Sequence, residues 1–273
     1  MNSTGNTSYQ LEGNAAELYE KYTVPTGAGP AAERLLEHVT LKPTDRVLDA
    51  ACGTGIVARL VAQAGTQVAS LVGLDLNQSM LDVARSLEPK ASFPITWENG
   101  DLCALPSPDS TFDVVLCNHG FQFVPDKPAA LNEIKRVLCD GGRYAFTVWS
   151  AAPPMNIAIA DSVRQHIGDE LVKSVLAPFS FRDAAVINQL VVDAGFENVS
   201  IEDIAFTRRF PANPSVGMDV IERSAYANDV AAATEAARVA ISQEVYQAMQ
   251  PYREGDELAE PISNFLVQAT KVR

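Results

Sequence analysis

The sequence predicts a doubly wound α/β fold, with a mostly parallel sheet of seven strands and helices on both of its faces. Short apolar runs of strand length alternate with segments whose apolar residues recur every three or four positions. This alternation requires right-handed crossovers between parallel strands. A glycine-rich turn, CGTG at 52–55, joins the first strand to the first helix that follows it. No apolar run approaches the ~20 residues of a bilayer span, so we expect no membrane span.

Each predicted strand is a short apolar run. In chain order they are RVLDAA (46–51), SLVGLDL (70–76), PITWEN (94–99), FDVVLCN (112–118), RYAFTVWS (143–150), VSIEDIAFTRRF (199–210) and ISNFLVQAT (262–270). Asn77 or Ser79 is suited to cap the helix after the second strand. Asp126 opens the helix after the fourth strand, and the turn DGG at 140–142 is expected to end it.

The spacing of these elements predicts a core with one insertion. We assign 30–210 and 260–273 to the α/β core and 211–259, which is rich in alanine and charge, to a helical insertion. Such an insertion between two late strands is typical of a cap over a substrate site. Additional scaffold and a dimer surface are the alternatives, so a homodimer is left open.

Composition excludes several classes of function. A net charge of −13 opposes binding to nucleic acid, because a polyanion repels phosphate backbones. The four cysteines have no CxxC spacing, and no Cys/His/Asp set has the spacing of metal ligands. We therefore expect reduced thiols and no metal. The first ten residues, MNSTGNTSYQ, do not resemble a secretory signal, which predicts a cytoplasmic protein.

The glycine turn is ambiguous about its ligand. Gly53, Gly55 and Ala58 have the spacing of a dinucleotide-binding turn. Asp75 ends the second strand, where such proteins place a ribose-binding acid. Asp49 opposes this interpretation, because a carboxylate beside a pyrophosphate costs on the order of kilocalories in a partly dehydrated cleft. S-adenosylmethionine suits the turn better: it has an adenosine, no phosphate, a sulfonium and an ammonium.

Five blocks of sequence support that ligand. They are VLDAACGTG, VGLDLNQSML, NGDLCALP, FDVVLCNHGFQFVPD and IKRVLCDGGRYAFTVW. In this order and at these intervals they resemble the class I S-adenosylmethionine-dependent methyltransferases, similar to the ubiquinone/menaquinone-biosynthesis type (methyltransferase type 11). The resemblance covers about 30–150 strongly. It implies a Rossmann-like methyltransferase fold and S-adenosyl-L-methionine as cofactor.

The first block is the methionine-binding loop by this resemblance. It contains Asp49, Ala50, Gly53 and Gly55, and the two glycines let the backbone approach the ligand without a Cβ in the way. Asp75 has two acceptor oxygens suited to the ribose hydroxyls, with a helix N-cap as the alternative.

The later blocks supply the adenine side and the methyl-transfer side. Leu76 and Met80 are expected to contact one side of the adenine. By the resemblance, Asp101, within Gly100–Leu102, accepts from the exocyclic amine of the adenine. Without the resemblance, Asp101 would be equally well explained as a turn residue. Asn118 is implied to contact the methionine portion where the methyl acceptor comes closest.

Two further features concern access and catalysis. Residues 1–29 are expected to form an N-terminal helical lid, in which Tyr19 or Tyr22 helps to cover the sulfonium; ordinary packing is the alternative. We place Tyr22 in the cofactor site. His119 is the candidate catalytic base, although a polar lining role is favoured because no partner is visible. His38 and His166 lie away from the motif.

The sequence thus predicts transfer of a methyl group from S-adenosylmethionine to oxygen or carbon of a small-molecule acceptor by in-line displacement. Acceptor selectivity is expected to depend on the cap, through Arg208, Arg209, Met218, Tyr226 and Tyr246. One alternative is a protein of this fold that binds the cofactor but catalyses another reaction, such as a cyclisation. A nicotinamide-dependent oxidoreductase is the third hypothesis, which Asp49 opposes.

Overall fold

The computed structural model describes residues 14–272, and the chain divides into two compact units. Unit 1 contains the chain up to Val148, Asp183–Asp203 and the residues from Phe265 on. Unit 2 contains Trp149–Arg182 and Ile204–Asn264. Unit 2 is therefore larger than the insertion predicted at 211–259. Residues 1–13 of the predicted N-terminal lid lie outside the described residues.

The sheet has the strand order β3-β2-β1-β4-β5-β8-β6, and the short β7 pairs with β8. The strands are β1 (Arg46–Ala50), β2 (Ser70–Asp75), β3 (Ile95–Asn99), β4 (Phe112–Asn118), β5 (Leu138–Trp149), β6 (Glu197–Pro211), β7 (Arg253–Glu254) and β8 (Glu257–Thr270). The first five pair in parallel. Backbone hydrogen bonds join Gly141 to Lys271 and Ser150 to Ser263, so β8 runs antiparallel to β5. The predicted mostly parallel sheet is confirmed: seven strands form the path above, and the two-residue β7 is an eighth.

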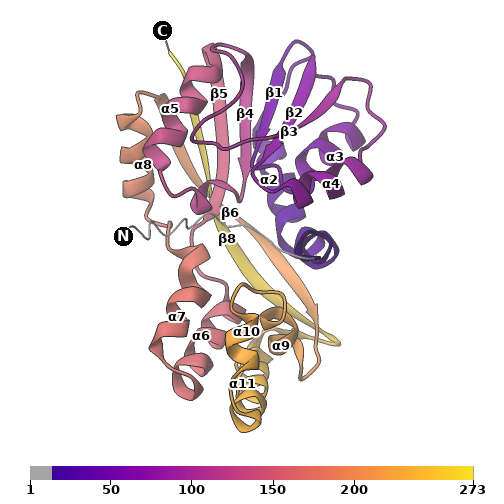
Figure 1. Cartoon of the computed structure of the whole chain (residues 1–273), viewed down its shortest axis with the longest axis vertical. Coiled ribbons are helices and arrows are strands. Elements are labelled where there is room, and N and C mark those ends of the chain that lie inside the picture. Colours follow the sequence, from indigo (N-terminus) through magenta and orange to yellow (C-terminus); the bar gives the residue numbers. More distant parts are fainter. Residues whose placement is uncertain (1–13, 273) are drawn as a thin grey trace, which may run out of the picture. The chain divides into compact units, whose positions relative to one another are not determined.

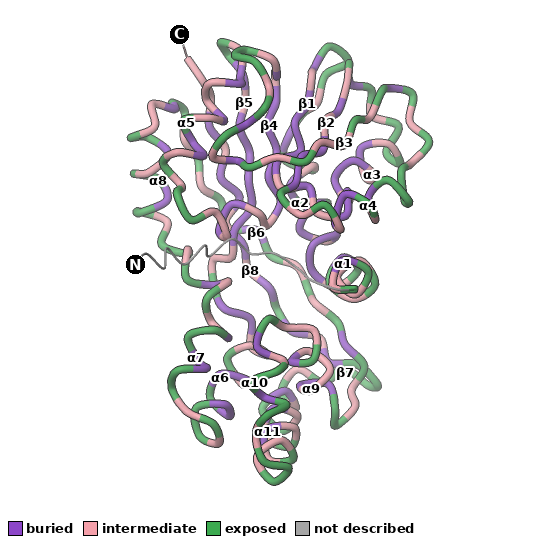
Figure 2. The backbone as a smooth tube through the Cα atoms, in the orientation of Figure 1, coloured by how far each residue is buried: buried purple, intermediate pink, exposed green. Residues whose placement is uncertain are grey.

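Helices flank the strands of unit 1, with α3 and α4 on one side of the view and α5 and α8 on the other (Figure 1). The helices of this unit are α1 (Ala15–Leu18), the π-helix η1 (Tyr19–Ala28), α2 (Gly29–His38), α3 (Ile56–Gln63), α4 (Gln78–Ser86), the 3₁₀ turn η2 (Phe121–Phe123), α5 (Lys127–Val137) and α8 (Ala184–Asp193). Strands β1 and β4 are buried along most of their length (Figure 2). Their carboxyl ends, as in other open parallel sheets, are where a ligand is expected.

Two local predictions change in the structure. The DGG segment is not a turn before the fifth strand, because β5 already begins at Leu138, directly after α5. Leu138 pairs with Phe112 and Arg143 pairs with Val114, so a bulge takes up the extra residues and Gly141 supplies a positive φ of 77°. Asn77 holds the N-cap position of α4 without a side-chain capping bond. Asp126 does cap α5, accepting from the Ala129 N–H at 2.9 Å, as predicted.

Unit 2 is mainly helical and has its own apolar core. It contains α6 (Pro154–His166), α7 (Asp169–Leu176), η3 (Ala177–Phe179), α9 (Val216–Ile221), α10 (Ala227–Ala231), α11 (Glu235–Ala248) and η4 (Gln250–Tyr252). Helix α6 packs against both α7 and α11. Fully buried residues such as Met155, Ile241 and Leu258 form one hydrophobic cluster with these helices. Residues 149–182 therefore belong to unit 2 and not to the α/β core to which the sequence analysis assigned them. None of the helices in 14–272 is by itself long and apolar enough to span a membrane; one bent pair, Asp169–Phe179 with Ala184–Asp193, passes that test only when taken together.

Candidate active site

The glycine turn links the carboxyl end of β1 to α3. Its backbone has positive φ at Ala51, Gly53 and Gly55, and the Cys52 N–H donates to the Leu74 carbonyl of β2 at 3.0 Å. A Cβ at Gly55 would lie 2.5 Å from the Trp97 ring. Close packing against that ring, together with a φ of 83°, therefore explains Gly55 without a ligand.

Gly53 is less crowded than Gly55. Among the described residues, a Cβ there would meet the ring edge of Tyr19 at 3.7 Å, an ordinary contact distance. The Gly53 N–H donates to Oδ2 of Asp75 at 2.8 Å. Of the two glycines predicted to admit the ligand, Gly53 is the one whose surroundings suit that role.

Asp75 ends β2 and connects two loops. Its Oδ1 accepts from the Asn77 N–H at 2.8 Å, and its Oδ2 accepts from Gly53. Asp75 also accepts hydrogen bonds from the Leu76 N–H and from the Asn77 side chain. The N-cap position of α4 belongs to Asn77, so the structure does not show the capping alternative for Asp75. Burial raises the pKa of Asp75, while the N–H groups of Asn77 and Gly53 oppose that shift. Its carboxylate oxygens, at the carboxyl end of β2, are acceptors of the kind that a vicinal diol requires.

Asp49, near the carboxyl end of β1, is a fully buried carboxylate. Within residues 14–272 no hydrogen-bond donor reaches either of its oxygens. Burial, and then the charge of Asp75, raise the pKa of Asp49 well above its usual range. A buried carboxylate without a donor is costly, so the site is electrostatically incomplete and favours a ligand that brings positive charge. The neighbouring Ala50 is also fully buried.

The loop after β3 carries the predicted adenine contacts. Asp101 is exposed, and its Oδ1 accepts from the Cys103 N–H at 2.8 Å. Leu102 and Met80 are buried, whereas Leu76 is 37% exposed, which is unusual for a leucine beside a buried acid. A Cβ at Gly100 would lie 2.9 Å from Leu74 Cδ1, so Gly100 is explained by packing of this loop.

Strand β4 ends at Asn118, and His119 follows it directly. The Asn118 amide donates to the Ala28 carbonyl at 2.9 Å and accepts from Thr147 Oγ1 at 2.9 Å. Its side chain therefore joins β4 to the end of η1, a role that the sequence did not indicate. His119 has a φ of 53°, and its backbone N–H donates to the carbonyl of Thr147 at 3.2 Å.

Arg59 links the segment 19–28 to the glycine turn through hydrogen bonds to both. Arg59 of α3 donates from Nη2 to both carboxylate oxygens of Glu20, at 2.7 and 2.9 Å, and from Nη1 to the Thr54 carbonyl. Tyr19, the alternative to Tyr22 in the sequence analysis, is the tyrosine beside Gly53. The Tyr22 ring instead has the Lys21 ammonium 4.8 Å from its centre.

Two candidate residues were missed. Thr54 is fully buried and Gln122 is 9% exposed, and neither the Thr54 hydroxyl nor the Gln122 amide has a hydrogen-bond partner in the described chain. Both are polar residues inside apolar or glycine-rich runs, CGTG and GFQF, and that contrast was the available signal. They belong to the loops after β1 and β4, the two strands that pair at the middle of the sheet.

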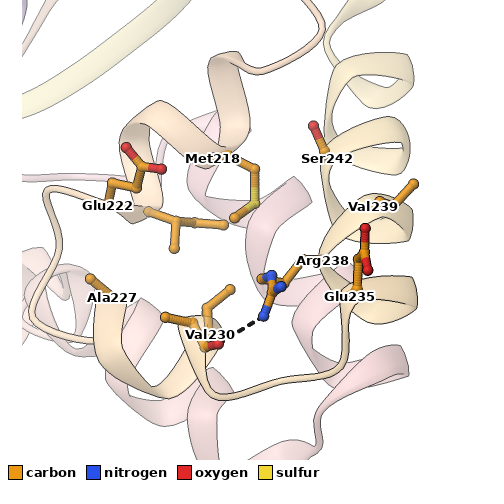
Figure 3. Close-up of a pocket in the computed structure, with 10 residues that line it drawn as sticks. Met218, Glu222, Ala227, Val230, Glu235, Arg238, Val239 and Ser242 are labelled. Carbon is orange, nitrogen blue, oxygen red and sulfur yellow. Dashed lines mark hydrogen bonds between the residues drawn. The ribbon is translucent and has the colours of Figure 1, made fainter.

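Unit 2 holds a separate cavity of about 510 Å³ between α9, α10 and α11 (Figure 3). Met218, one of the predicted selectivity residues, lines it with Ile221 and Val230. Arg238 borders this cavity, and its Nη1 donates to the Ala231 carbonyl at 2.8 Å.

The other predicted selectivity residues do not line this cavity, and they contact other residues of unit 2. Arg208 pairs with the fully buried Glu260, and Arg209 pairs with Glu254 and Glu257. Tyr226 is buried, and the Tyr246 hydroxyl accepts from Arg253 at 3.2 Å.

These features fit S-adenosylmethionine. Asp49 has no donor among the described residues, and an ammonium would supply one. Asp75 is a buried acceptor suited to a diol, and the nearest described atom to a Cβ at Gly53 would be on the Tyr19 ring, at 3.7 Å. Leu76 offers an exposed apolar surface to a base. A pyrophosphate would face both carboxylates, which is unfavourable.

Comparisons with known proteins identify methyltransferases as relatives of this chain. Residues 48–146 match the family model described as a methyltransferase domain. The chain is 31% identical over 193 residues to the ubiquinone/menaquinone biosynthesis C-methyltransferase of Roseobacter denitrificans, covering 63% of this chain and 74% of that protein. It is 40% identical over 107 residues to the 2-phytyl-1,4-naphtoquinone methyltransferase of Synechococcus elongatus, covering 38% of this chain and 46% of that protein. The chain thus spans about half the length of the latter relative.

The fold is shared with solved structures. A putative methyltransferase from Bacillus halodurans superimposes with a TM-score of 0.57 at 20% identity, over 89% of this chain and 100% of that one. This likeness shows the Rossmann-like methyltransferase fold. The match over most of the Roseobacter protein places the chain in the S-adenosylmethionine-dependent methyltransferase family, of the ubiquinone/menaquinone-biosynthesis type, whose cofactor is S-adenosyl-L-methionine.

Proposed function

We propose that the protein transfers a methyl group from S-adenosylmethionine to an oxygen or carbon atom of a small-molecule acceptor. The observation that carries the proposal is the pair of buried acids at the ends of β1 and β2. Asp49 has no donor among the described residues, and Asp75 lies beside the glycine turn, where its carboxylate accepts from the Gly53 N–H. The curated relatives are methyltransferases by name, so they do not favour the cyclisation alternative.

The cofactor supplies a methyl group that a sulfonium already activates, so the protein's task is positioning and exclusion of water. An acceptor oxygen or carbon forms the bond to the methyl carbon, and the electron pair of the S–CH₃ bond stays on sulfur. The acceptor proton leaves to water or to a base. Alignment of the two reactants can supply up to ~7–11 kcal/mol of such a barrier.

Individual residues have distinct proposed roles. Asp49 attracts the ammonium of the cofactor's amino-acid tail, Asp75 binds the ribose hydroxyls and Asp101 accepts from the adenine amine. His119 lines the acceptor side and is not required as a base, because methyl transfer from a sulfonium does not generally need one. In-line displacement follows from the need to attack opposite the departing sulfur.

The acceptor class is proposed by similarity to the quinone-type relatives. Phenols and quinols are the first candidates, and the 211–259 segment, including Met218 in the unit 2 cavity, is proposed to contribute acceptor selectivity. A cap role for that segment, a homodimer, a cytoplasmic location and the lack of nucleic-acid binding stay predictions.

The experiment is an assay for S-adenosylhomocysteine release with a panel of phenols and quinols, with mass spectrometry of the products. A methylated product that forms together with S-adenosylhomocysteine supports the proposal. Cofactor binding followed by conversion of an acceptor without any S-adenosylhomocysteine would instead support the cyclisation-type alternative.

A further inference from the structure

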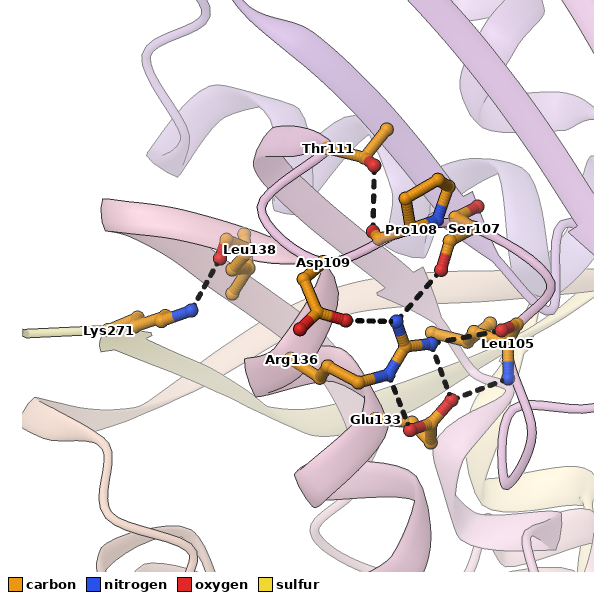
Figure 4. A network of polar contacts seen from close by, with 9 residues as sticks. All are labelled: Leu105, Ser107, Pro108, Asp109, Thr111, Glu133, Arg136, Leu138 and Lys271. Atoms are coloured by element: carbon orange, nitrogen blue, oxygen red, sulfur yellow. Dashed lines mark hydrogen bonds and ion pairs between the residues drawn. The ribbon is translucent and has the colours of Figure 1, made fainter.

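Two charged side chains of helix α5, Glu133 and Arg136, bind the loop that follows β3 (Figure 4). Arg136 donates to the Leu105 carbonyl at 3.0 Å, the Ser107 carbonyl at 2.9 Å and Oδ1 of Asp109 at 2.8 Å. Glu133, one turn earlier on α5, accepts from the Leu105 N–H at 2.8 Å. Both backbone groups of Leu105 are therefore fixed by the same helix.

The two side chains are themselves locked together. Arg136 donates from Nε to Oε1 of Glu133 and from Nη2 to Oε2, each at 2.8 Å. This two-pronged geometry is specific to the planar guanidinium, and a lysine could not reproduce it. Hydrogen bonding from Arg136 also holds the pKa of Glu133 below its usual range, so the pair stays ionised near neutral pH.

The pair differs from ordinary helix-surface pairs in this molecule. Arg34 and Glu37 are also three residues apart, at 2.7 Å, but their side chains are 44% and 52% exposed. Glu133 and Arg136 are 22% and 31% exposed, and they bind backbone groups of a distant loop. An exposed ion pair contributes little to stability. Surface stabilisation alone therefore does not explain why Arg136 also binds the backbone of the loop after β3.

The restrained loop begins with the predicted adenine contact. Asp101 and Ala104 form an isolated bridge, and the Ala104 N–H donates to the Asp101 carbonyl at 3.0 Å. Leu105 follows immediately, so its two anchored backbone groups limit the path of the chain back to Asp101. The Asp101 side chain is exposed at the start of this short, fixed segment.

We propose that Glu133 and Arg136 are positioning residues that fix Asp101 against the adenine amine and so set the base selectivity of the cofactor site. The inference rests on the proposed function, and it adds a residue pair outside the binding loops. Arg136 acts through the loop backbone and does not itself touch the ligand.

The test compares two ligands by calorimetric titration: S-adenosylhomocysteine, and S-inosylhomocysteine, which has a carbonyl in place of the exocyclic amine. A charged hydrogen bond to the amine predicts a wild-type preference for the adenine ligand of roughly 10–100-fold. In Arg136→Gln this preference should fall below about threefold, while affinity for the inosine ligand changes less than about threefold. Arg34→Gln, the matched surface-pair control, should keep the wild-type preference.

Several results would overturn the inference. A parallel loss of affinity for both ligands in Arg136→Gln indicates general damage to the site, and an unchanged preference indicates that the loop does not depend on Arg136. Should Arg136→Gln not fold, Glu133→Gln gives the same decision, because it removes the charge that binds both Arg136 and the Leu105 N–H. A wild-type protein that binds neither ligand would refute the proposed function itself, whereas wild-type binding with unchanged selectivity in the variants refutes only this inference.

Discussion

Replacing Asp49 by asparagine should stabilise the ligand-free protein and weaken cofactor binding. The carboxylate is fully buried, and no donor in residues 14–272 reaches it. Asparagine has nearly the same shape and removes the uncompensated charge. A buried neutral polar group without a partner costs on the order of 1–3 kcal/mol, and a charged group costs more. The gain is this difference, about 1 kcal/mol, which corresponds to roughly 2–4 °C in Tm for a chain of this size class.

The effect should depend on pH in a defined direction. Burial and the charge of Asp75 raise the pKa of Asp49 in the folded protein. A carboxyl whose folded pKa lies above its unfolded value contributes stability at low pH and loses that contribution as pH rises through the folded pKa. The stability advantage of Asp49→Asn should therefore be small near about pH 5 and larger near about pH 8.

Thermal unfolding at both pH values, without ligand, measures the stability change, and calorimetric titration measures the affinity for S-adenosylmethionine. We expect the affinity to fall roughly 5–150-fold, the equivalent of about 1–3 kcal/mol. Asp45→Asn is the matched control: Asp45 is also buried, but it pairs with Arg143 and accepts from the Lys42 N–H. That variant should lose stability. A less stable Asp49→Asn at high pH, or one with unchanged affinity, would refute the reasoning.

Three further predictions test the other residues. Asp75→Ala should weaken S-adenosylmethionine binding by about 1–3 kcal/mol in a titration, because the diol loses a charged acceptor; unchanged affinity would remove Asp75 from the site. Gly53→Ala and Gly65→Ala should each lose about 1 kcal/mol of stability, since both glycines have positive φ. Only Gly53→Ala should also lose affinity for the cofactor. Equal cofactor affinities of the two variants would contradict the placement of the ligand. Asparagine tolerates the φ of 53° at position 119, so His119→Asn should change turnover less than about tenfold and keep the same pH profile. A pH-dependent loss of turnover of roughly 10²–10⁴-fold at intact cofactor affinity would instead identify His119 as a base.

The sequence was sufficient for the features that depend on periodicity. Strands such as 46–51 and 70–76 agree with β1 and β2 to within one residue, because apolar runs of strand length must be covered on both faces of a parallel sheet. The acidic turn that favoured S-adenosylmethionine also depends only on residue type and order, and the family assignment is confirmed.

Features that depend on packing between distant segments could not be predicted from the sequence. Helix α6 has an apolar pattern that any core could bury, and its contacts with α7 and α11 assign it to unit 2. Gly55 and Gly100 satisfy the packing of Trp97 and Leu74, which no local pattern reveals. The bond from Asn118 to Ala28 joins residues 90 positions apart.

Calorimetric titration of the wild-type protein with S-adenosylhomocysteine and with NAD tests the central claim most directly. The buried acids at Asp49 and Asp75 should favour the ligand that has an ammonium and no phosphate. We predict saturable binding of S-adenosylhomocysteine and an affinity for NAD at least roughly 100-fold weaker, because a pyrophosphate would approach two carboxylates. Binding of NAD as tight as that of S-adenosylhomocysteine, or no binding of S-adenosylhomocysteine, would contradict the account.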